Sequence, residues 1–260
     1  MALIDVNGRN VEYFQEGCGS DLLLLHTLLG DVSVYDTILP RLAKQRRVTR
    51  LSFPGFGNSA PGCKSVDELA DWTARAIQKL RLPASCDVFA NGAGGFVSVG
   101  LAIRHGELFN RLVVADAGAT FPKEAKVPLH GMSQKVRAGG MQSILDIAVA
   151  RMFPPSYAVS HGDVIDERKR RLLTVDPDAF ADTCLALAAL DYRPNLVQIS
   201  TNVLVVVGSE DKTTPPSLSR ELAHGIANSL YEELIGVGHC PQIQDPDQLF
   251  EKIGGFLDLS

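Results

Sequence analysis

Short apolar segments alternate with amphipathic ones along most of this chain, and that alternation limits the possible folds more than any other feature. The apolar segments have the length of strands, and several are apolar throughout, as strands buried on both faces of a sheet are. The segments between them have helical periodicity; in Ser65–Leu80, the residues Leu69, Trp72 and Ile77 fall on one face. The pattern predicts an α/β fold with a mostly parallel sheet covered by helices on both faces.

The strand–helix rhythm is interrupted once, between about Thr120 and Ser200, where only helical segments follow one another. We interpret residues 120–200 as a helical cap inserted into an α/β core formed by residues 1–119 and 201–260. The expected strands are VEYF near the start and residues 22–26, 47–53, 87–90, 111–117, 202–208 and 229–236; the expected core helices are residues 65–80, 94–104, 217–226 and the closing segment QLFEKIGGFLDL.

Composition excludes several classes of function. The 260 residues carry a net charge of −5 and no long basic run, which makes nucleic acid and anionic membranes poor partners. The basic stretch ERKRR at 167–171 is short and is expected to be a solvated helix face. The start MALIDVNGRNVEYF is unlike a signal peptide, and the longest apolar run, CLALAAL, is too short to span a bilayer. The five scattered cysteines lack metal-binding spacing and suggest free thiols in the cytoplasm. The pattern gives no oligomeric state.

Two polar residues follow the ends of expected strands, where open α/β sheets bind their ligands. Asp211 lies in VVVGSEDKTTPP and His239 in GVGHCPQIQDP. Each by itself has an ordinary interpretation, as a turn aspartate or a surface histidine. Together they match the second and third members of the chain order Ser…Asp…His, in which the aspartate fixes the imidazole tautomer.

The first member of that order should lie on a sharp turn between a strand and a helix. The segment DVFANGAGGFVSVG, residues 87–100, has the required small residues around such a turn, but Gly92 occupies the position of the nucleophile. Ser98 lies too far into the expected helix to replace it, and Cys240 beside His239 is better explained as a small buried thiol.

The whole chain resembles the α/β-hydrolase family, and within it the 3-oxoadipate enol-lactonases. The segments that carry the resemblance are HTLLGDVSVYDTILPRL, PGFGNS, RAGGMQSILDIAVARMFPP, LLTVDPDAFADTCLALAALDYRPNL, GSEDKTTPP and GHCPQIQDP.

This resemblance implies an eight-stranded core, a helical cap over the active site and no cofactor or metal. It implies a hydrogen-bonded pair of Asp211 and His239. It also implies an oxyanion hole from backbone N–H groups at Ala93 and Leu28, with His26 in a structural role.

The chain departs from the family pattern at the positions that matter for chemistry. The family's serine is Gly92 here, and the aspartate of the D-x-x-G-x-G loop is Ser52. Gln244 and Asp245 stand where a glutamate often precedes the last proline of the histidine motif. The chain therefore cannot form an acyl-enzyme on a serine at this sharp turn, which we call the elbow.

Three interpretations remain open. In the first, the chain is a cofactor-independent enzyme in which His239 and Asp211 act as a general base on a small lactone, enol or β-dicarbonyl substrate. The base would activate a water in the space left by Gly92, or form an enolate, which allows hydrolysis as well as lyase, isomerase or decarboxylase chemistry. In the second, it is an inactive binding protein for a small molecule; in the third, a Ser-to-Gly variant of an enol-lactonase.

Further residues are candidates for binding the substrate. Asn91 precedes the vacant nucleophile position and could form a hydrogen bond to a ligand. Arg137 would attract a carboxylate if the substrate carries one. The apolar cap residues considered as pocket lining are Met132, Met141, Met152 and Phe153.

Overall fold

The eight strands form one sheet in the order β1-β2-β4-β3-β5-β6-β7-β8. The computed structural model describes residues 1–259. Neighbouring strands from β4 to β8 run parallel, whereas β1 and β2 are antiparallel at one edge. The α/β fold with a mostly parallel eight-stranded sheet is therefore confirmed. The strands are β1 (Ala2–Val6), β2 (Arg9–Glu16), β3 (Ser20–Leu25), β4 (Arg46–Leu51), β5 (Asp87–Asn91), β6 (Arg111–Ala115), β7 (Asn202–Gly208) and β8 (Ser229–Leu234).

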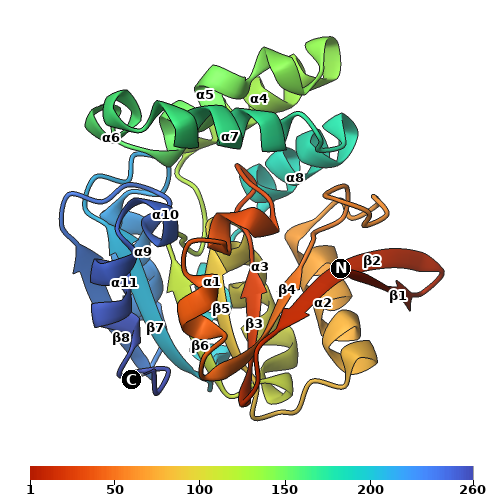
Figure 1. Cartoon of the computed structure of the whole chain (residues 1–260), viewed down its shortest axis with the longest axis vertical. Coiled ribbons are helices and arrows are strands. Elements are labelled where there is room, and N and C mark those ends of the chain that lie inside the picture. The colour runs from red at the N-terminus through yellow and green to blue at the C-terminus, as the bar shows by residue number, and fades with distance from the viewer. Residues whose placement is uncertain (260) are drawn as a thin grey trace.

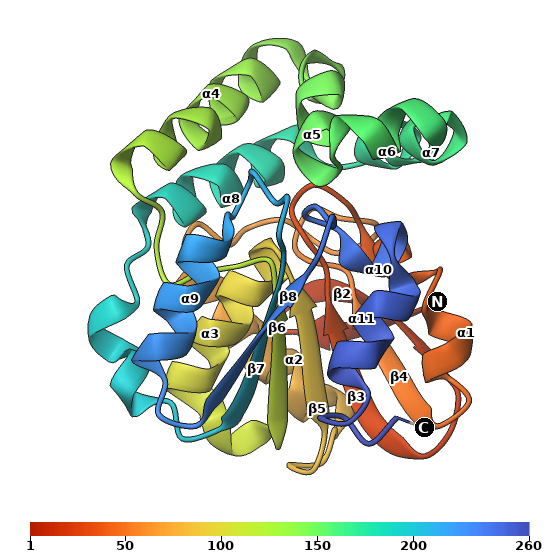
Figure 2. The same ribbon diagram turned by 90° about the vertical axis from the view of Figure 1, so that its left-hand side faces the viewer.

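Helices cover both faces of the sheet, because side chains alternate between the faces along each strand. In β3, Leu23 and Leu25 join one core with α2, α3 and α9, while Leu22 and Leu24 join a second core with α1 and α11. Figure 2 shows the helices on either side of the strands. The core helices are α1 (Leu39–Leu42), α2 (Val66–Leu80), α3 (Ala93–His105), α9 (Pro216–Gly225), α10 (Pro241–Gln244) and α11 (Pro246–Ile253).

The remaining helices form a layer above the carboxyl ends of the strands (Figure 1). They follow β6 and precede β7 in the chain. They are α4 (Lys123–Gly139), α5 (Leu145–Met152), α6 (Pro155–Ser160), α7 (Gly162–Leu172) and α8 (Pro177–Ala189).

Several elements differ from the sequence-based expectation. Strand β1 and helices α4 and α6 were not predicted. Helix α4 contains Pro128, which weakens the helical signal; packing against α8 stabilises α4 nonetheless. The closing helix was predicted to continue to the end of QLFEKIGGFLDL, but α11 ends at Ile253, where Gly254 and Gly255 follow. Two successive glycines make further helix costly.

A buried ionic cluster joins three strands at the amino edge of the sheet. The Asp87 carboxylate lies 2.6 Å from Arg46 of β4 and 2.9 Å from Arg111 of β6. Both oxygens of the carboxylate are engaged, since Asn110 and Arg111 also donate to Oδ1. This cluster lies at the edge opposite the carboxyl ends, which leaves those ends free to form a site.

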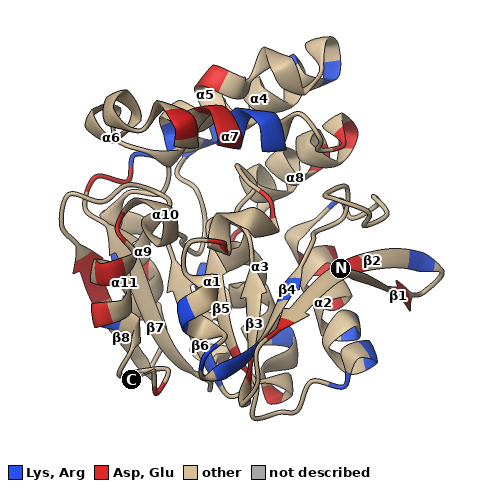
Figure 3. Ribbon diagram, in the orientation of Figure 1, with Lys and Arg blue, Asp and Glu red and all other residues tan. Residues whose placement is uncertain are grey.

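The basic stretch of α7 forms ion pairs with nearby acids rather than a basic patch. Figure 3 shows both signs of charge along this helix. Glu167 lies 2.7 Å from Arg170 and from Arg171, and Lys169 lies 2.6 Å from Asp146. Arg168 departs from the expected solvated face: it is buried and donates to the Ser33 hydroxyl.

His26 is fully buried just after β3 and links two strand ends. Its Nε2 accepts the N–H of Phe53 at 3.0 Å, and its Nδ1–H donates to the carbonyl of Thr27 at 2.8 Å. The contact with Phe53 requires a neutral ring, because a protonated Nε2 could not accept a hydrogen bond. Burial lowers the pKa of His26, which favours the same neutral form.

We predict that His26 makes the protein less stable at mildly acidic pH. An unfolded histidine has a pKa of about 6.5, so below that pH the unfolded chain binds a proton more readily than the folded one. The contribution of His26 to the free energy of unfolding should be complete above pH ~6.5. Below that pH the free energy of unfolding should fall, by up to about 1.4 kcal/mol per pH unit from this group. Urea unfolding between pH 7.5 and 5.5 measures the slope.

The matched variants are His26→Gln and His130→Gln, since His130 is exposed on α4. His26→Gln should flatten the slope and His130→Gln should leave it unchanged. An equal slope in wild type and His26→Gln would contradict the prediction.

Candidate active site

Asp211 and His239 meet at the carboxyl edge of the sheet. Asp211 follows β7 and His239 follows β8, and Asp211 Oδ2 lies 2.9 Å from His239 Nδ1. Both side chains are buried, with relative exposures of 2% and 3%. The Asp211 carboxylate is held by the N–H groups of Thr213 and Thr214, at 2.7 and 3.1 Å from Oδ1. The aspartate thus has a fixed orientation toward the imidazole.

This contact defines the state of the imidazole. Nδ1–H donates to Asp211, so Nε2 keeps its lone pair and can accept a proton. The Thr214 hydroxyl supports the pair, lying 2.6 Å from Asp211 Oδ2 and 3.1 Å from His239 Nδ1. An imidazole held in this way can act as a general base.

A second carboxyl group, Asp116, lies behind the pair at the end of β6. Burial raises its pKa well above the ordinary value, and the nearby Asp211 raises it further. Asp116 Oδ1 accepts a hydrogen bond from the N–H of Gly208 at 2.9 Å. This hydrogen bond lowers the pKa of Asp116, but it offsets only part of the increase. Asp116, Asp211 and His239 present ligand atoms within 4.8 Å of one another. Hydrogen bonds already occupy both oxygens of Asp211. Burial and the nearby Asp211 favour the protonated form of Asp116.

Gly92 lies at the turn between β5 and α3, with φ 58° and ψ −120°. This left-handed backbone is rarely adopted by L side chains. An ideal Cβ on Gly92 would lie 2.8 Å from His239 Nε2, so the turn points directly at the base.

The Thr27 hydroxyl fills the space next to Gly92. The same ideal Cβ would lie 2.4 Å from Thr27 Oγ1 and 2.8 Å from Thr27 Cβ. Thr27 Oγ1 is 3.4 Å from His239 Nε2 and 3.4 Å from the N–H of Leu29. The Thr27 side chain, from the loop after β3, thus takes up space that a side chain on Gly92 would need.

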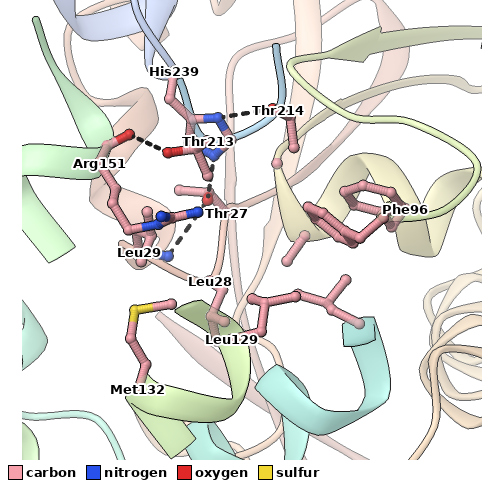
Figure 4. A pocket seen from close by; sticks show the side chains of 14 residues that line it. Thr27, Leu28, Leu29, Phe96, Leu129, Met132, Arg151, Thr213, Thr214 and His239 are labelled. Atoms are coloured by element: carbon pink, nitrogen blue, oxygen red, sulfur yellow. Dashed lines mark hydrogen bonds between the residues drawn. The ribbon is translucent and has the colours of Figure 1, made fainter. Parts of the chain in front are cut away.

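These groups open onto a small cavity of about 30 Å³ between the cap layer and the sheet (Figure 4). This volume is far below that of ligand sites, about 300–1,000 Å³, so a bound substrate requires the cavity to widen. Its wall is mostly apolar, which favours a small substrate with few polar groups. The cavity is lined by Thr27, Leu28, Leu29, Gly92, Ala93, Phe96, Phe121, Leu129, Met132, Arg151, Leu187, Thr213, Thr214 and His239.

Of the residues proposed for the oxyanion hole and the pocket, three line the cavity: Leu28, Ala93 and Met132. Ala93 is the first residue of α3, and N–H groups of a first helical turn have no acceptor within the helix. Met141 and Phe153 are buried in the core instead, and Phe153 stacks on Tyr157.

Two polar residues expected to contact substrate have other roles. Asn91 is buried, and its Nδ2 donates to the carbonyl of His239 at 3.0 Å while its Oδ1 accepts from Gln242 at 3.1 Å. It therefore holds the histidine loop in place. Arg137 lies on the outside of the cap, where it pairs with Asp182.

The arginine that does line the cavity is Arg151, at the end of α5, and sequence reasoning missed it. Its Nε is buried without a hydrogen-bond partner among residues 1–259. Burial lowers the pKa of Arg151, although a guanidinium stays charged. Figure 4 shows the side chain extending along the wall toward the loop of Thr27 and Leu29.

Backbone contacts connect this arginine to the base. The carbonyl of Arg151 accepts the Thr213 hydroxyl at 2.7 Å, and the carbonyl of Met152 accepts the N–H of His239 at 3.0 Å. The end of α5 is thereby attached to both loops that carry the Asp211–His239 pair, and the cation is fixed relative to them.

Cys240, beside His239, is fully buried, and burial raises the pKa of its thiol well above the ordinary value. A thiol that stays protonated is a poor nucleophile.

Comparison with known proteins gives consistent matches over most of the chain. A family model described as the alpha/beta hydrolase family matches residues 22–252. The 3-oxoadipate enol-lactonase 2 of Acinetobacter baylyi is 27% identical over 74% of this chain and 70% of its own length. The pimeloyl-(acyl-carrier protein) methyl ester esterase of Aeromonas hydrophila is 29% identical over 95% of this chain and 98% of its own.

A solved structure agrees with these relatives. The crystal structure of the enol-lactonase from Burkholderia xenovorans LB400 superposes with a TM-score of 0.91 at 27% identity, covering 99% of this chain and 100% of that one. None of the helices in the described part of the chain is long and apolar enough to cross a membrane.

We predict opposite outcomes for the two buried carboxyl groups. Asp211→Asn removes the charge that orients His239 and should lower kcat by about a hundredfold or more. Asp116→Asn replaces a neutral acid by a neutral amide of the same shape and should stay within about threefold of wild type. Steady-state kinetics, with circular dichroism to verify folding, compares them. If Asp116→Asn were the slow variant, the negative charge would reside on Asp116.

Proposed function

The chain belongs to the α/β-hydrolase family, and from this premise we propose that it is a cofactor-independent hydrolase of a small, carboxylated lactone or ester. His239, oriented by Asp211, acts as the general base. The observation that carries the proposal is the 2.9 Å contact between His239 Nδ1 and Asp211 Oδ2, with Nε2 directed at the cavity.

The base acts without a serine at the elbow, because Gly92 has no side chain. Proton removal from an oxygen nucleophile needs only a lone pair on His239 Nε2 within reach of that oxygen. The attacked carbonyl then gains negative charge. The N–H groups of Leu28 and Ala93, whose residues line the same cavity, are the proposed donors to that oxyanion.

The proposed substrate carries a carboxylate because of Arg151. Of the described residues that line the cavity, Arg151 alone has a permanent charge. A guanidinium whose buried Nε lacks a hydrogen-bond partner, as in Arg151, is stabilised by an anion, and the bond is charge-assisted. The cap layer, residues 120–200, would close over such a substrate and exclude water.

The names of the relatives are consistent with this chemistry. Enol-lactonases and a methyl ester esterase both cleave the single bond between a carbonyl carbon and the ester oxygen. A cavity with an imidazole base and apolar walls suits this reaction. We favour small lactones as substrates, because the cavity is small.

We predict that the wild-type chain hydrolyses small lactones or methyl esters that bear a carboxylate, and that His239→Ala lowers kcat by about 10²–10⁴-fold. Product formation by chromatography over a panel of such substrates, with β-dicarbonyl compounds included, measures this. Turnover unaffected by His239→Ala would refute the role of the base. No turnover of any substrate by the wild type would indicate a binding protein.

We predict that Arg151→Met raises KM for a carboxylated substrate by about 10- to 100-fold, the value of a lost charge-assisted hydrogen bond. The KM for the corresponding neutral methyl ester should change little. Arg137→Met is the matched control, because Arg137 lies on the outer surface of the same cap. Equal effects of the two substitutions, or equal effects on charged and neutral substrates, would contradict the assignment.

A further inference from the structure

We propose that the Thr27 hydroxyl is the catalytic nucleophile, so that Thr27, His239 and Asp211 form a triad whose first member comes from the loop after β3. The inference rests on the proposed function, since it requires His239 to act as a base. It goes beyond it by naming the oxygen from which His239 takes the proton.

The position of the hydroxyl carries the inference. An ideal Cβ on Gly92 would lie 2.4 Å from Thr27 Oγ1, closer than two non-bonded atoms approach. A side chain on the elbow and the Thr27 hydroxyl therefore exclude one another. The glycine permits the hydroxyl to occupy the position beside the base that an elbow side chain would otherwise take.

Thr27 also meets the requirement for contact with the base. Its Oγ1 lies 3.4 Å from His239 Nε2, the ring nitrogen left as acceptor once Nδ1–H donates to Asp211. Hydrogen bonds between nucleophile and base are often this long in the absence of substrate. No second base is needed, because the same imidazole serves both half-reactions.

The backbone of Thr27 is held rigidly, which a nucleophile requires. Its carbonyl accepts Nδ1–H of His26 at 2.8 Å and the N–H of Gly30 at 3.4 Å. The residue itself is 1% exposed and lines the cavity, and its hydroxyl is directed at His239 Nε2. The next residue, Leu28, brings its N–H to the same wall.

The reaction would proceed in two balanced steps. Thr27 Oγ1 attacks the carbonyl carbon while its proton passes to His239 Nε2; the tetrahedral intermediate then expels the alkoxide, which takes that proton. In the second step a water gives its proton to His239 and attacks the acyl-threonine. Collapse of this intermediate releases the carboxylic acid and returns the proton to Thr27.

The kinetic test compares Thr27→Val, which has nearly the same shape and no hydroxyl, with Thr27→Ser, which keeps the hydroxyl. Thr27→Val should lower kcat at least about a hundredfold, and Thr27→Ser should retain activity within about tenfold. Thermal unfolding verifies that both variants fold. Thr27→Val with wild-type kcat, while His239→Ala is inactive, would overturn the nucleophile and leave the proposed function standing.

A covalent test separates nucleophile from positioning residue. A small alkyl fluorophosphonate should phosphonylate the wild type with loss of fluoride, and peptide mass spectrometry should place the adduct on Thr27. Thr27→Val and His239→Ala should both remain unlabelled. An adduct at another residue, or none on an active wild-type enzyme, would overturn the proposal. A chain neither labelled nor active would overturn the proposed function together with it.

Substitution at the elbow provides an independent test. Gly92→Ser introduces a Cβ into the position next to Thr27 Oγ1, so alone it should lower the thermal midpoint or displace the threonine. Combining it with Thr27→Gly removes the clash, and the double variant should regain stability and acquire its fluorophosphonate adduct on the hydroxyl introduced at the elbow. Additive losses of stability in the double variant would show that the two positions do not share one space, and would overturn the proposal.

Discussion

The close approach of the β3 loop to the turn between β5 and α3 is the constraint on which the site depends. The N–H of Gly94 donates to the carbonyl of His26 at 3.1 Å, and a Cβ on Gly94 would lie only 2.2 Å from the carbonyl of Leu25. Glycine at this position lets two parallel neighbours bring their carboxyl ends together. The consequence is that Thr27, one residue beyond His26, lies directly against Gly92 and close to His239.

Around this contact the charges are arranged in one order. Burial and the nearby Asp211 raise the pKa of Asp116, which favours its neutral form, and Asp211 orients the imidazole. Elsewhere on the cavity wall Arg151 supplies the opposite charge. The carbonyls of Arg151 and Met152 accept hydrogen bonds from Thr213 and His239, so the end of α5 is joined to both loops of the Asp211–His239 pair.

Much of the architecture could be predicted from local patterns. Strands such as Asn202–Gly208 are apolar throughout, and α2 has a regular apolar face, so both were expected within a residue or two. Asp211 and His239 were found because residues after parallel strands converge at one edge of a sheet. The cap arginines show the limit of such reasoning. Arg137 and Arg151 both follow apolar helical residues, and only the packing of α5 against the sheet distinguishes the one inside the cavity from the one outside.

The sequence by itself determined the α/β fold, the small-residue turn at Gly92 and the two residues that form the acid–imidazole pair. These follow from hydrophobic periodicity and from the steric demand of a tight turn, which are local properties of a chain. Only the tertiary structure decided what fills the space beside Gly92. Thr27 and Gly92 are far apart in the chain, and their contact depends on the β3–β5 register, in which Leu25 pairs with Ala90. No local pattern contains that register, because it results from the packing of the whole sheet.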